Sequence, residues 1–452
     1  MDASGNGSSG GKRESFGSRF GVIAATAGSA VGLGNIWKFP YETGVNGGSA
    51  FLLIYLLFVF MLGVPVMVAE FTIGREGRSN AYGCFDRIAP NSPWRLVGIM
   101  CIVTAFMIIT FYSTVAGWTL EYTFNAFTIA AKDFNAGAYF GDFIVHPWRP
   151  VMWQVIFLVI TAVVILRGVT KGIERYSKIL MPLLFLLILV ICVRSLMLEG
   201  AFKGIEFLFK PDFSKINSDV ILNAMGQAFF SLSLGMGAII TYGSYVKSND
   251  NLVETSVQVS LADALVAVLA GIMIFPAVFA FGVEPAAGPS LVYITLPGIF
   301  ANMAAGGFWS LLFFLLLTVA ALTSMISLFE VTTIFFIDFF KLSRRNGTLV
   351  VTALAILVGI PVTLSMGVLS DVMIFGKSLF DLMDFCASNV FMPLGGLLMV
   401  LFVGWGPGRT MFYEQVTNGG TKNLGAFRAL SFLLKFVVPI LIVIIQVNML
   451  FL

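Results

Sequence analysis

The stretch AGSAVGLGN at residues 27–35 lies in the middle of the first long apolar segment of the chain. It holds three glycines and one asparagine, and a glycine destabilises a helix by about 1 kcal/mol relative to alanine. The stretch GQAFFSLSLGMG at residues 226–237 interrupts a later apolar segment with similar small and polar residues. Close packing of helices through small residues would explain either stretch alone. Two such stretches at corresponding places in the chain favour two broken helices.

The composition around these stretches is that of a membrane protein. Of the 452 residues, 58% are hydrophobic and 11% are charged, whereas soluble domains carry roughly 25% charged residues. The mean hydropathy is +0.93. These values exclude a cytosolic enzyme, a nucleic-acid-binding protein and a secreted domain built on disulfides. The single histidine, His146, and the four scattered cysteines give no credible zinc or iron site.

The apolar residues form eleven segments that are long enough to cross a bilayer as helices, at about 20 residues each. We therefore expect an all-α integral membrane protein with eleven transmembrane helices. The predicted spans are 20–43, 49–74, 96–130, 150–167, 177–198, 217–246, 253–283, 308–340, 349–366, 374–403 and 427–451.

The broken segments are the first and the sixth spans, so spans one to five and six to ten can be oppositely oriented copies. Interrupted helices at matching places in two halves indicate a transport site at the midplane of the bilayer. Unwound backbone there offers carbonyls to a cation, and helix N-termini face an anionic group. We expect one transporter domain over residues 12–452, after a disordered Gly/Ser-rich tail at 1–11. Its parts are repeat one at about 12–200, repeat two at about 215–405 and an added helix at about 427–451.

The distribution of basic residues predicts the orientation in the membrane. With the N-terminus inside, most of the 27 Lys and Arg residues fall in cytoplasmic segments. An odd number of spans then places the C-terminus outside. We expect a multi-pass protein of the cell membrane, with a cytoplasmic N-terminus and an extracellular C-terminus.

Four motifs closely resemble those of the neurotransmitter:sodium symporter family. They are GSAVGLGNIWKFPY at residues 28–41, NGGSAF at 46–51, the stretch 65–74 and QAFFSLSLG at 227–235. The resemblance implies the leucine-transporter fold, with an inverted 5+5 repeat and unwound helices one and six. Eleven spans are typical of its bacterial branch, and the chain resembles the bacterial carriers of hydrophobic amino acids most.

The same resemblance implies two sodium sites at the breaks. The first would consist of the Ala30 carbonyl, the side chains of Asn35, Ser231 and Asp263, and the substrate carboxylate. The second would consist of the carbonyls of Gly28, Val31 and Ala320 and the hydroxyls of Thr323 and Ser324. The alternative for these two hydroxyls is a hydrogen bond to the preceding turn of their own helix.

Asp263 is a carboxylate inside a predicted span, which is costly and indicates a functional role. Animal relatives place Asn near this position and bind chloride beside the first sodium. Asp263 would supply that negative charge covalently, so we predict that transport is independent of chloride. The alternative is a boundary residue at the cytoplasmic end of the span, which begins near Leu252.

The resemblance also implies a substrate pocket. Amine-carrying relatives have an Asp where this chain has Gly32, so the space there suits a substrate carboxylate, which would meet Leu33, Gly34 and the Tyr112 hydroxyl. The ammonium would meet carbonyls near Ala30, Phe230 and Ser233, and Ser231 and Ser324 would adjoin both substrate and sodium. The walls would be apolar, from Ile108, Phe230, Met236, Met325 and Leu328.

Charged residues beside the pocket resemble the gates of the family. Lys38 and Asp384 would form the outer ion pair, although Arg is usual at the first position. Arg13 and Asp338 would form the inner pair, with Tyr245 nearby. The alternative for these charges is a role as solvated flanking residues. Gly172 and Pro182 bracket a segment at the start of the fifth span that both residues weaken, so we expect a hinge there.

The sequence therefore predicts a sodium-coupled symporter of hydrophobic L-amino acids that works by alternating access. It is expected to have two sodium ions, a bilayer environment, no nucleic-acid partner, no enzyme activity and a monomeric or weakly dimeric state. Two alternatives remain open at this point. They are a symporter of another small zwitterion, such as a betaine or an imino acid, and a non-transporting amino-acid sensor.

Overall fold

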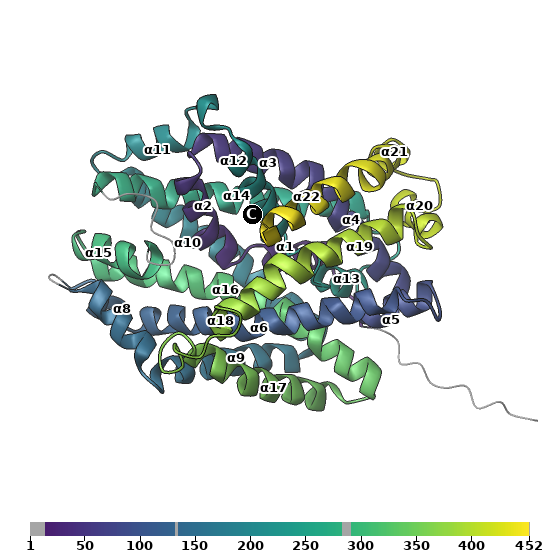
Figure 1. Ribbon diagram of the computed structural model, residues 1–452, viewed down its shortest axis with the longest axis horizontal. Helices are drawn as coiled ribbons and strands as arrows, with labels where there is room; N and C mark the ends of the chain where they lie inside the picture. Colours follow the sequence, from purple (N-terminus) through teal and green to yellow (C-terminus); the bar gives the residue numbers. More distant parts are fainter. Residues whose placement is uncertain (1–13, 132–133, 283–290, 452) are drawn as a thin grey trace, which may run out of the picture.

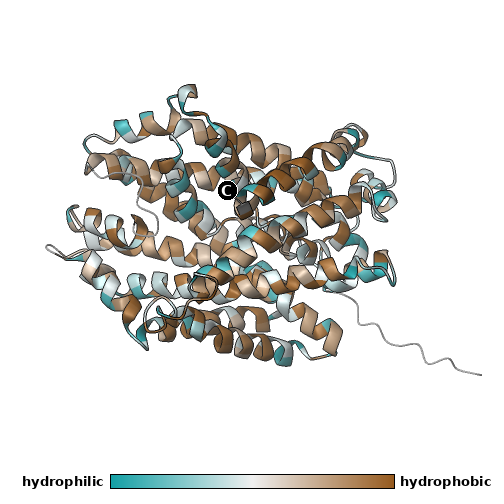
Figure 2. Ribbon diagram, viewed as in Figure 1, coloured by the Kyte–Doolittle hydropathy of each residue, from teal (hydrophilic) through white to brown (hydrophobic). Residues whose placement is uncertain are grey.

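The computed structural model describes residues 14–131, 134–282 and 291–451. Long helices run side by side, with α8 (Ala136–Val145), α11 (Phe202–Phe209) and α15 (Leu296–Ala301) at one end of the bundle. At the other end lie α5 (Ala81–Ile88), α20 (Arg409–Thr417) and α21 (Leu424–Phe432), as Figure 1 shows. Hydrophobic residues line the long helices, and most hydrophilic residues gather towards the two ends (Figure 2).

The predicted bundle of membrane-spanning helices is confirmed, and the number of spans agrees roughly with the eleven predicted. Among the described residues, nine helices are long and apolar enough to cross a membrane, and a tenth span is bent by 51° at its break. This bent span comprises α1 (Arg19–Ala30), η1 (Gly34–Lys38) and α2 (Phe39–Val45). The predicted sixth span corresponds to the pair α12 (Ser218–Ser231) and α13 (Ala238–Gly243), whose halves are separated by residues 232–237.

The remaining spans follow the predicted order along the chain. Before the broken sixth span they are α3 (Ser49–Phe58) with η2 (Val59–Gly63) and α4 (Val64–Gly77), α6 (Arg95–Phe124) followed by α7 (Ala126–Ile129), α9 (Arg149–Leu166), and η3 (Val169–Glu174) with α10 (Arg175–Leu196). After it come α14 (Leu252–Ala280), α16 (Gly306–Phe340) and α17 (Arg344–Leu364). The last two are α18 (Leu379–Asp384) with η6 (Phe385–Phe391) and α19 (Met392–Gly404), and η7 (Leu433–Val437) with α22 (Val438–Phe451). The short elements η4 (Phe213–Lys215) and η5 (Leu291–Thr295) lie between spans.

The core of the bundle surrounds the two broken spans. α1 packs against α10, α14 and α16, and α12 packs against α3 and α22. Around them, α6 packs against both α16 and α9. Helices at the periphery expose large apolar side chains, such as Leu186 and Val193 of α10, because their outer faces meet lipid and not water. The fold thus places irregular backbone only where other helices enclose it, as the bilayer requires.

Candidate functional site

The two breaks lie against each other and are held by side chains. The Ser233 hydroxyl donates to the Ser29 carbonyl at 2.9 Å, and Gln227 Nε2 donates to the Gly34 carbonyl at 3.2 Å. Gly235, with φ at +82°, donates its N–H to the buried Glu70 carboxylate at 2.8 Å. Backbone groups that a continuous helix would have paired internally are thus satisfied from neighbouring elements.

Four polar side chains meet at one side of the breaks; we call them the Asp263 cluster, comprising Asn35, Tyr55, Ser231 and Asp263. Asn35 Nδ2 donates to Asp263 Oδ1 at 2.7 Å. The hydroxyls of Ser231 and Tyr55 donate to Asp263 Oδ2 at 3.0 and 3.2 Å. All four side chains are buried. Asp263 lies about three turns inside α14, so the alternative of a boundary residue at the end of the span is wrong.

Five oxygen-bearing residues meet at the other side; we call them the α16 cluster, comprising Gly28, Val31, Ala320, Thr323 and Ser324. Ser324 Oγ lies 3.4 Å from the Gly28 carbonyl oxygen and 3.3 Å from that of Val31. Thr323 Oγ1 lies 2.9 Å from the Ala320 oxygen and 3.4 Å from that of Val31. The Thr323 hydroxyl therefore bonds both its own helix and the broken one, whereas the Ser324 hydroxyl bonds carbonyls of the broken one. The set consists of neutral, hard oxygens, which suit an alkali cation.

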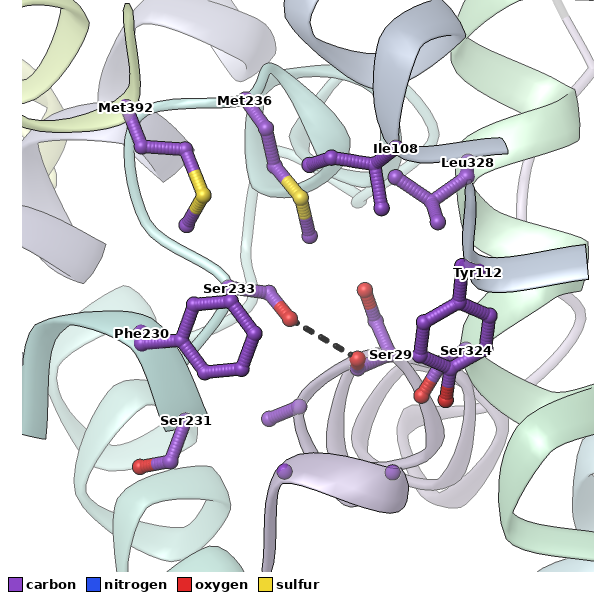
Figure 3. A pocket seen from close by; sticks show the side chains of 13 residues that line it. Ser29, Ile108, Tyr112, Phe230, Ser231, Ser233, Met236, Ser324, Leu328 and Met392 are labelled. Atoms are coloured by element: carbon purple, nitrogen blue, oxygen red, sulfur yellow. Dashed lines mark hydrogen bonds between the residues drawn. The ribbon is translucent and has the colours of Figure 1, made fainter. Parts of the chain in front are cut away.

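A cavity of about 40 Å³ lies between the two clusters. Figure 3 shows Met236 and Met392 side by side on one wall, with Ile108 next to Met236 and with Leu328 and Tyr112 across the opening from Met392. Phe230 and Ser233 lie below the methionines, and Ser29 and Ser324 border the opposite edge (Figure 3). The cavity is lined by Ser29, Ala30, Gly32, Gly34, Ile108, Tyr112, Phe230, Ser231, Ser233, Met236, Ser324, Leu328 and Met392.

Gly32 leaves space at the polar edge of this cavity. A Cβ atom at this position would lie 2.4 Å from Ser324 Oγ and 2.9 Å from the Tyr112 hydroxyl. The Tyr112 hydroxyl also accepts the N–H of Leu33 at 3.2 Å. A small polar group that enters here meets hydroxyls from two helices, while most of the other side chains that line the cavity are apolar.

Two predicted pocket residues lie elsewhere. Met325 is fully buried but does not line the cavity, because it follows Ser324 by one residue and is rotated by about 100° around α16. Ser324 and Leu328, four residues apart, share the face that lines the cavity. Leu33 lines a second cavity, described below, that lies on the other side of Tyr112 and Phe230.

The sodium:neurotransmitter symporter family matches residues 13–134 and 145–451 of the chain. The chain belongs to this family. It is therefore a sodium-dependent, multi-pass membrane transporter and not an enzyme. The broken first and sixth spans are those that its sequence motifs predicted, and the fold is the leucine-transporter fold.

Individual relatives agree with this assignment. The sodium-dependent transporter YhdH of Bacillus subtilis is 40% identical over 96% of both chains. The GABA transporter ine of Drosophila melanogaster, which is named as sodium- and chloride-dependent, is 25% identical over 88% of this chain and 47% of its own. The crystal structure of MhsT in complex with L-phenylalanine matches 97% of this chain and 100% of that one, with a TM-score of 0.89 and 45% identity. The sequence motifs also resemble those of MhsT.

The outer gate residues of this symporter lie around a second, larger cavity of about 290 Å³. Tyr112 and Phe230 line both cavities and separate them. Lys38 and Asp384 both line the larger cavity, but within the described part of the chain they form no ion pair with each other. Lys38 Nζ lies 4.3 Å from the centroid of the Phe230 ring, and Asp384 accepts from the Ser388 hydroxyl at 2.7 Å.

At the opposite end of the symporter, a different set of charged residues forms hydrogen bonds and an ion pair. The Tyr245 hydroxyl donates to Glu330 Oε1 at 2.6 Å, and Arg344 pairs with Glu330 at 2.8 Å. Asp338 accepts from the backbone and side chain of Asn80, both at 3.1 Å. Arg13, the predicted partner of Asp338, lies outside the described residues, as does the predicted tail at 1–11.

The predicted hinge of the symporter is helical in this structure. Gly172 lies within the π-helix η3, and Pro182 lies inside α10. Met181, the residue before the proline, has its sulfur 3.3 Å from where a Cβ of Gly28 would lie, which places the segment beside the α16 cluster. Glu174 accepts from the Gly17 N–H at 2.7 Å and the Ser18 hydroxyl at 3.1 Å, so it ties the start of α10 to the start of α1.

Sequence reasoning missed several residues of the site. Tyr55 and Met392 are an aromatic and an apolar residue in apolar spans, and nothing in the sequence separates them from core residues. Glu330 and Glu70 did carry a signal, because a carboxylate inside a span is a functional candidate by default.

Proposed function

We propose that this symporter takes up hydrophobic L-amino acids, both aliphatic and aromatic, together with sodium and without a need for chloride. One observation carries the proposal. The cavity between the two clusters has apolar walls, and Gly32 leaves its polar edge without a carboxylate that could bind a substrate amine. The complex of MhsT with L-phenylalanine supports the same class of substrate.

The substrate is held by groups at the edge of the cavity. Its carboxylate lies in the space beside Gly32, where it accepts from the Tyr112 hydroxyl and the backbone near Leu33 and Gly34. Its ammonium donates to carbonyls near Ala30 and Phe230, with the Ser233 hydroxyl nearby. Its side chain packs against apolar residues of the walls, among them Ile108, Met236 and Leu328. Met236 adapts to side chains of different shape, because its thioether chain is flexible.

Two sodium ions travel with the substrate. The first binds between Ala30, Asn35, Ser231, Asp263 and the substrate carboxylate, and the second replaces the hydrogen bonds of the α16 cluster. The contact between the first ion and the substrate carboxylate couples the two, since each then favours binding of the other. The membrane potential adds about 2.3 kcal/mol per charge per 100 mV to the driving force.

Asp263 makes the first sodium site independent of chloride. Its carboxylate is buried among three hydrogen-bond donors and belongs to a span in the middle of the bundle. A sodium ion beside it is balanced by a charge that is part of the chain. No anion from solution is then needed for the site to be electrically balanced.

Alternating access results from opening and closing of the bundle at its outer and inner ends. Lys38 and Asp384 approach each other over Phe230 when the outer side closes. The inner side opens when Arg13, Tyr245 and Asp338 separate and the segment from Gly172 to Pro182 unwinds. The protein works in the cell membrane, as a monomer or weak dimer, with its N-terminus in the cytoplasm and its C-terminus outside.

Uptake into proteoliposomes tests the proposal. Labelled leucine and phenylalanine are offered under an inward sodium gradient, with sodium replaced by choline and chloride by gluconate in separate arms. We expect uptake of both amino acids that requires sodium and persists in gluconate. Uptake without sodium, or only with chloride, would contradict it. Uptake of a betaine or proline alone would indicate the other zwitterion, and binding without uptake would indicate a sensor.

A further inference from the structure

A third cavity lies directly behind the wall of the substrate cavity. It has a volume of about 10 Å³ and lies between α12, the η6–α19 junction and α22. Phe230 and Met392 line both this cavity and the substrate cavity, so their side chains form the partition between the two. The rest of the lining includes Gly226 of α12 and Ile445 and Met449 of α22, together with the polar residues Lys38, Ser388 and Asn389.

In this partition, Met392 has a flexible side chain on a closely packed backbone. The backbone of Met392 packs closely against the break that follows α12, since its carbonyl oxygen lies only 2.0 Å from where a Cβ of Gly235 would be. Its side chain has three rotatable bonds and a polarisable sulfur, so it moves at little cost. The residue stands where the π-helix η6 ends and α19 begins, and π-helical turns are frequent at functional sites.

The third cavity provides space into which the Met392 side chain can move. Gly226 has no side chain, and a Cβ there would lie 2.8 Å from the terminal methyl of Met449, so any added carbon would fill this space. Met449 is a second thioether that can shift. The volume of about 10 Å³ is close to the minimum for one water, so the cavity serves as room for movement and not as a separate binding site.

We propose that Met392 is a movable wall whose side chain shifts into the space behind it, and that the space it leaves is an extension of the substrate pocket for the distal ring of a bulky aromatic side chain, such as an indole. The inference rests on the proposed function and names its substrate range more closely. A leucine side chain is accommodated with Met392 in the position observed here. An indole pushes the Met392 thioether towards Gly226 and Met449 and occupies the space that it leaves.

This extension also gives the eleventh span a role in substrate choice. α22 lies outside the two repeats, yet Ile445 and Met449 line the third cavity. Gln446 Nε2 donates to the Asn389 carbonyl at 2.7 Å, which fixes α22 against η6 at this level. The distance that Met392 can move is therefore set by α22 as well as by α12.

Two variants with opposite effects test the inference, with the ratio of uptake efficiency for tryptophan over leucine as the readout. Gly226→Ala fills the space behind Met392 and should lower this ratio about 10-fold, the effect of one carbon in an apolar pocket. Met392→Ala removes the partition and should raise the ratio, and it should admit the larger naphthylalanine. Gly425→Ala is the matched control, since a Cβ at that position meets open space.

The outcomes separate this inference from the function on which it rests. If the wild-type protein takes up neither amino acid under a sodium gradient, the proposed function fails and the extension fails with it. If the wild type takes up both but the two variants leave the ratio within about 2-fold, or shift it in the same direction, only the movable wall is refuted. A tryptophan complex with Met392 unmoved would refute it independently.

Discussion

The two oxygen clusters on either side of the substrate cavity differ in one respect that matters for sodium, which is their charge. The Asp263 cluster contains a full carboxylate with three donors around it. The α16 cluster consists of three carbonyls and two hydroxyls, all neutral. Both clusters border the same break in α1, so the difference lies in the helices that face it, α14 and α16.

The difference suggests separate tasks for the two ions. A cation beside a buried carboxylate is held strongly, because the number of charged ligands largely sets cation affinity. A cation among neutral oxygens is held more weakly, and the predicted hinge in α10 lies next to this neutral cluster through Met181. We expect the α16 cluster to release its ion first towards the inside, and the Asp263 cluster to bind ion and substrate together.

The largest effect is expected when the difference in charge is removed. Asp263→Asn makes both clusters neutral and replaces one of the two acceptor oxygens with an NH2 donor, so sodium-dependent uptake in gluconate should fall by about 100-fold or more. Chloride should restore part of this activity. Labelled leucine uptake in gluconate and in chloride measures both effects, with the exposed Asp219→Asn as control. Unchanged uptake in gluconate would show that the charge of Asp263 has no role.

A smaller effect is expected from filling the space between the clusters. Gly32→Ala places a methyl group 2.4 Å from Ser324 Oγ, where the substrate carboxylate is proposed to lie. The KM for leucine should rise by about 30-fold, a typical consequence of overpacking. Gly141→Ala, which adds a Cβ with open space around it, is the control. An unchanged KM would mean that the carboxylate lies elsewhere.

The neutral cluster is tested by removing one of its oxygens. Thr323→Val keeps the shape of the side chain but loses the hydroxyl, which is worth roughly 1 kcal/mol. The sodium concentration that gives half-maximal uptake should rise by about 5- to 10-fold. Ser310→Ala serves as control because, among the described residues, its buried hydroxyl on the same helix has no hydrogen-bond partner. Equal effects of the two variants would argue against a sodium ion at Thr323.

The smallest effect is expected at the hinge. Pro182→Ala restores a backbone donor inside α10, so the segment beside the α16 cluster should unwind less readily. Uptake should slow about 3-fold while equilibrium binding of leucine is retained, because the substrate pocket is not altered. Pro361→Ala, at a proline inside α17, is the matched control. An uptake rate in the Pro182→Ala variant equal to that of the wild type would contradict the proposed hinge.

The fold followed from the sequence because membrane residence leaves few options. Apolar segments of sufficient length must be helices, and a break in such a helix is tolerated only where other helices enclose it. The residues of the two breaks were therefore visible as motifs, and the structure brings them together with Asp263, Thr323 and Ser324.

Which residues face the substrate cavity depends on the rotation of each helix about its axis. An apolar sequence does not reveal this rotation. Met325 was expected in the pocket and faces away, whereas Met392 faces the cavity and was not expected. In helices that are apolar on every side, periodicity does not separate the cavity face from the core face. The sequence also does not reveal which charged residues pair with each other. The ion pair between Glu330 and Arg344 is an example.

The central claim is that the substrate carboxylate completes the first sodium site, and binding measurements on purified protein test it most directly. The affinities for leucine and for leucinol, which has a hydroxymethyl group in place of the carboxylate, are measured with and without sodium. We predict that sodium raises the affinity for leucine by about 10-fold or more and leaves that for leucinol almost unchanged. An equal gain for both compounds would contradict the claim, because the carboxylate would then have no part in binding the ion.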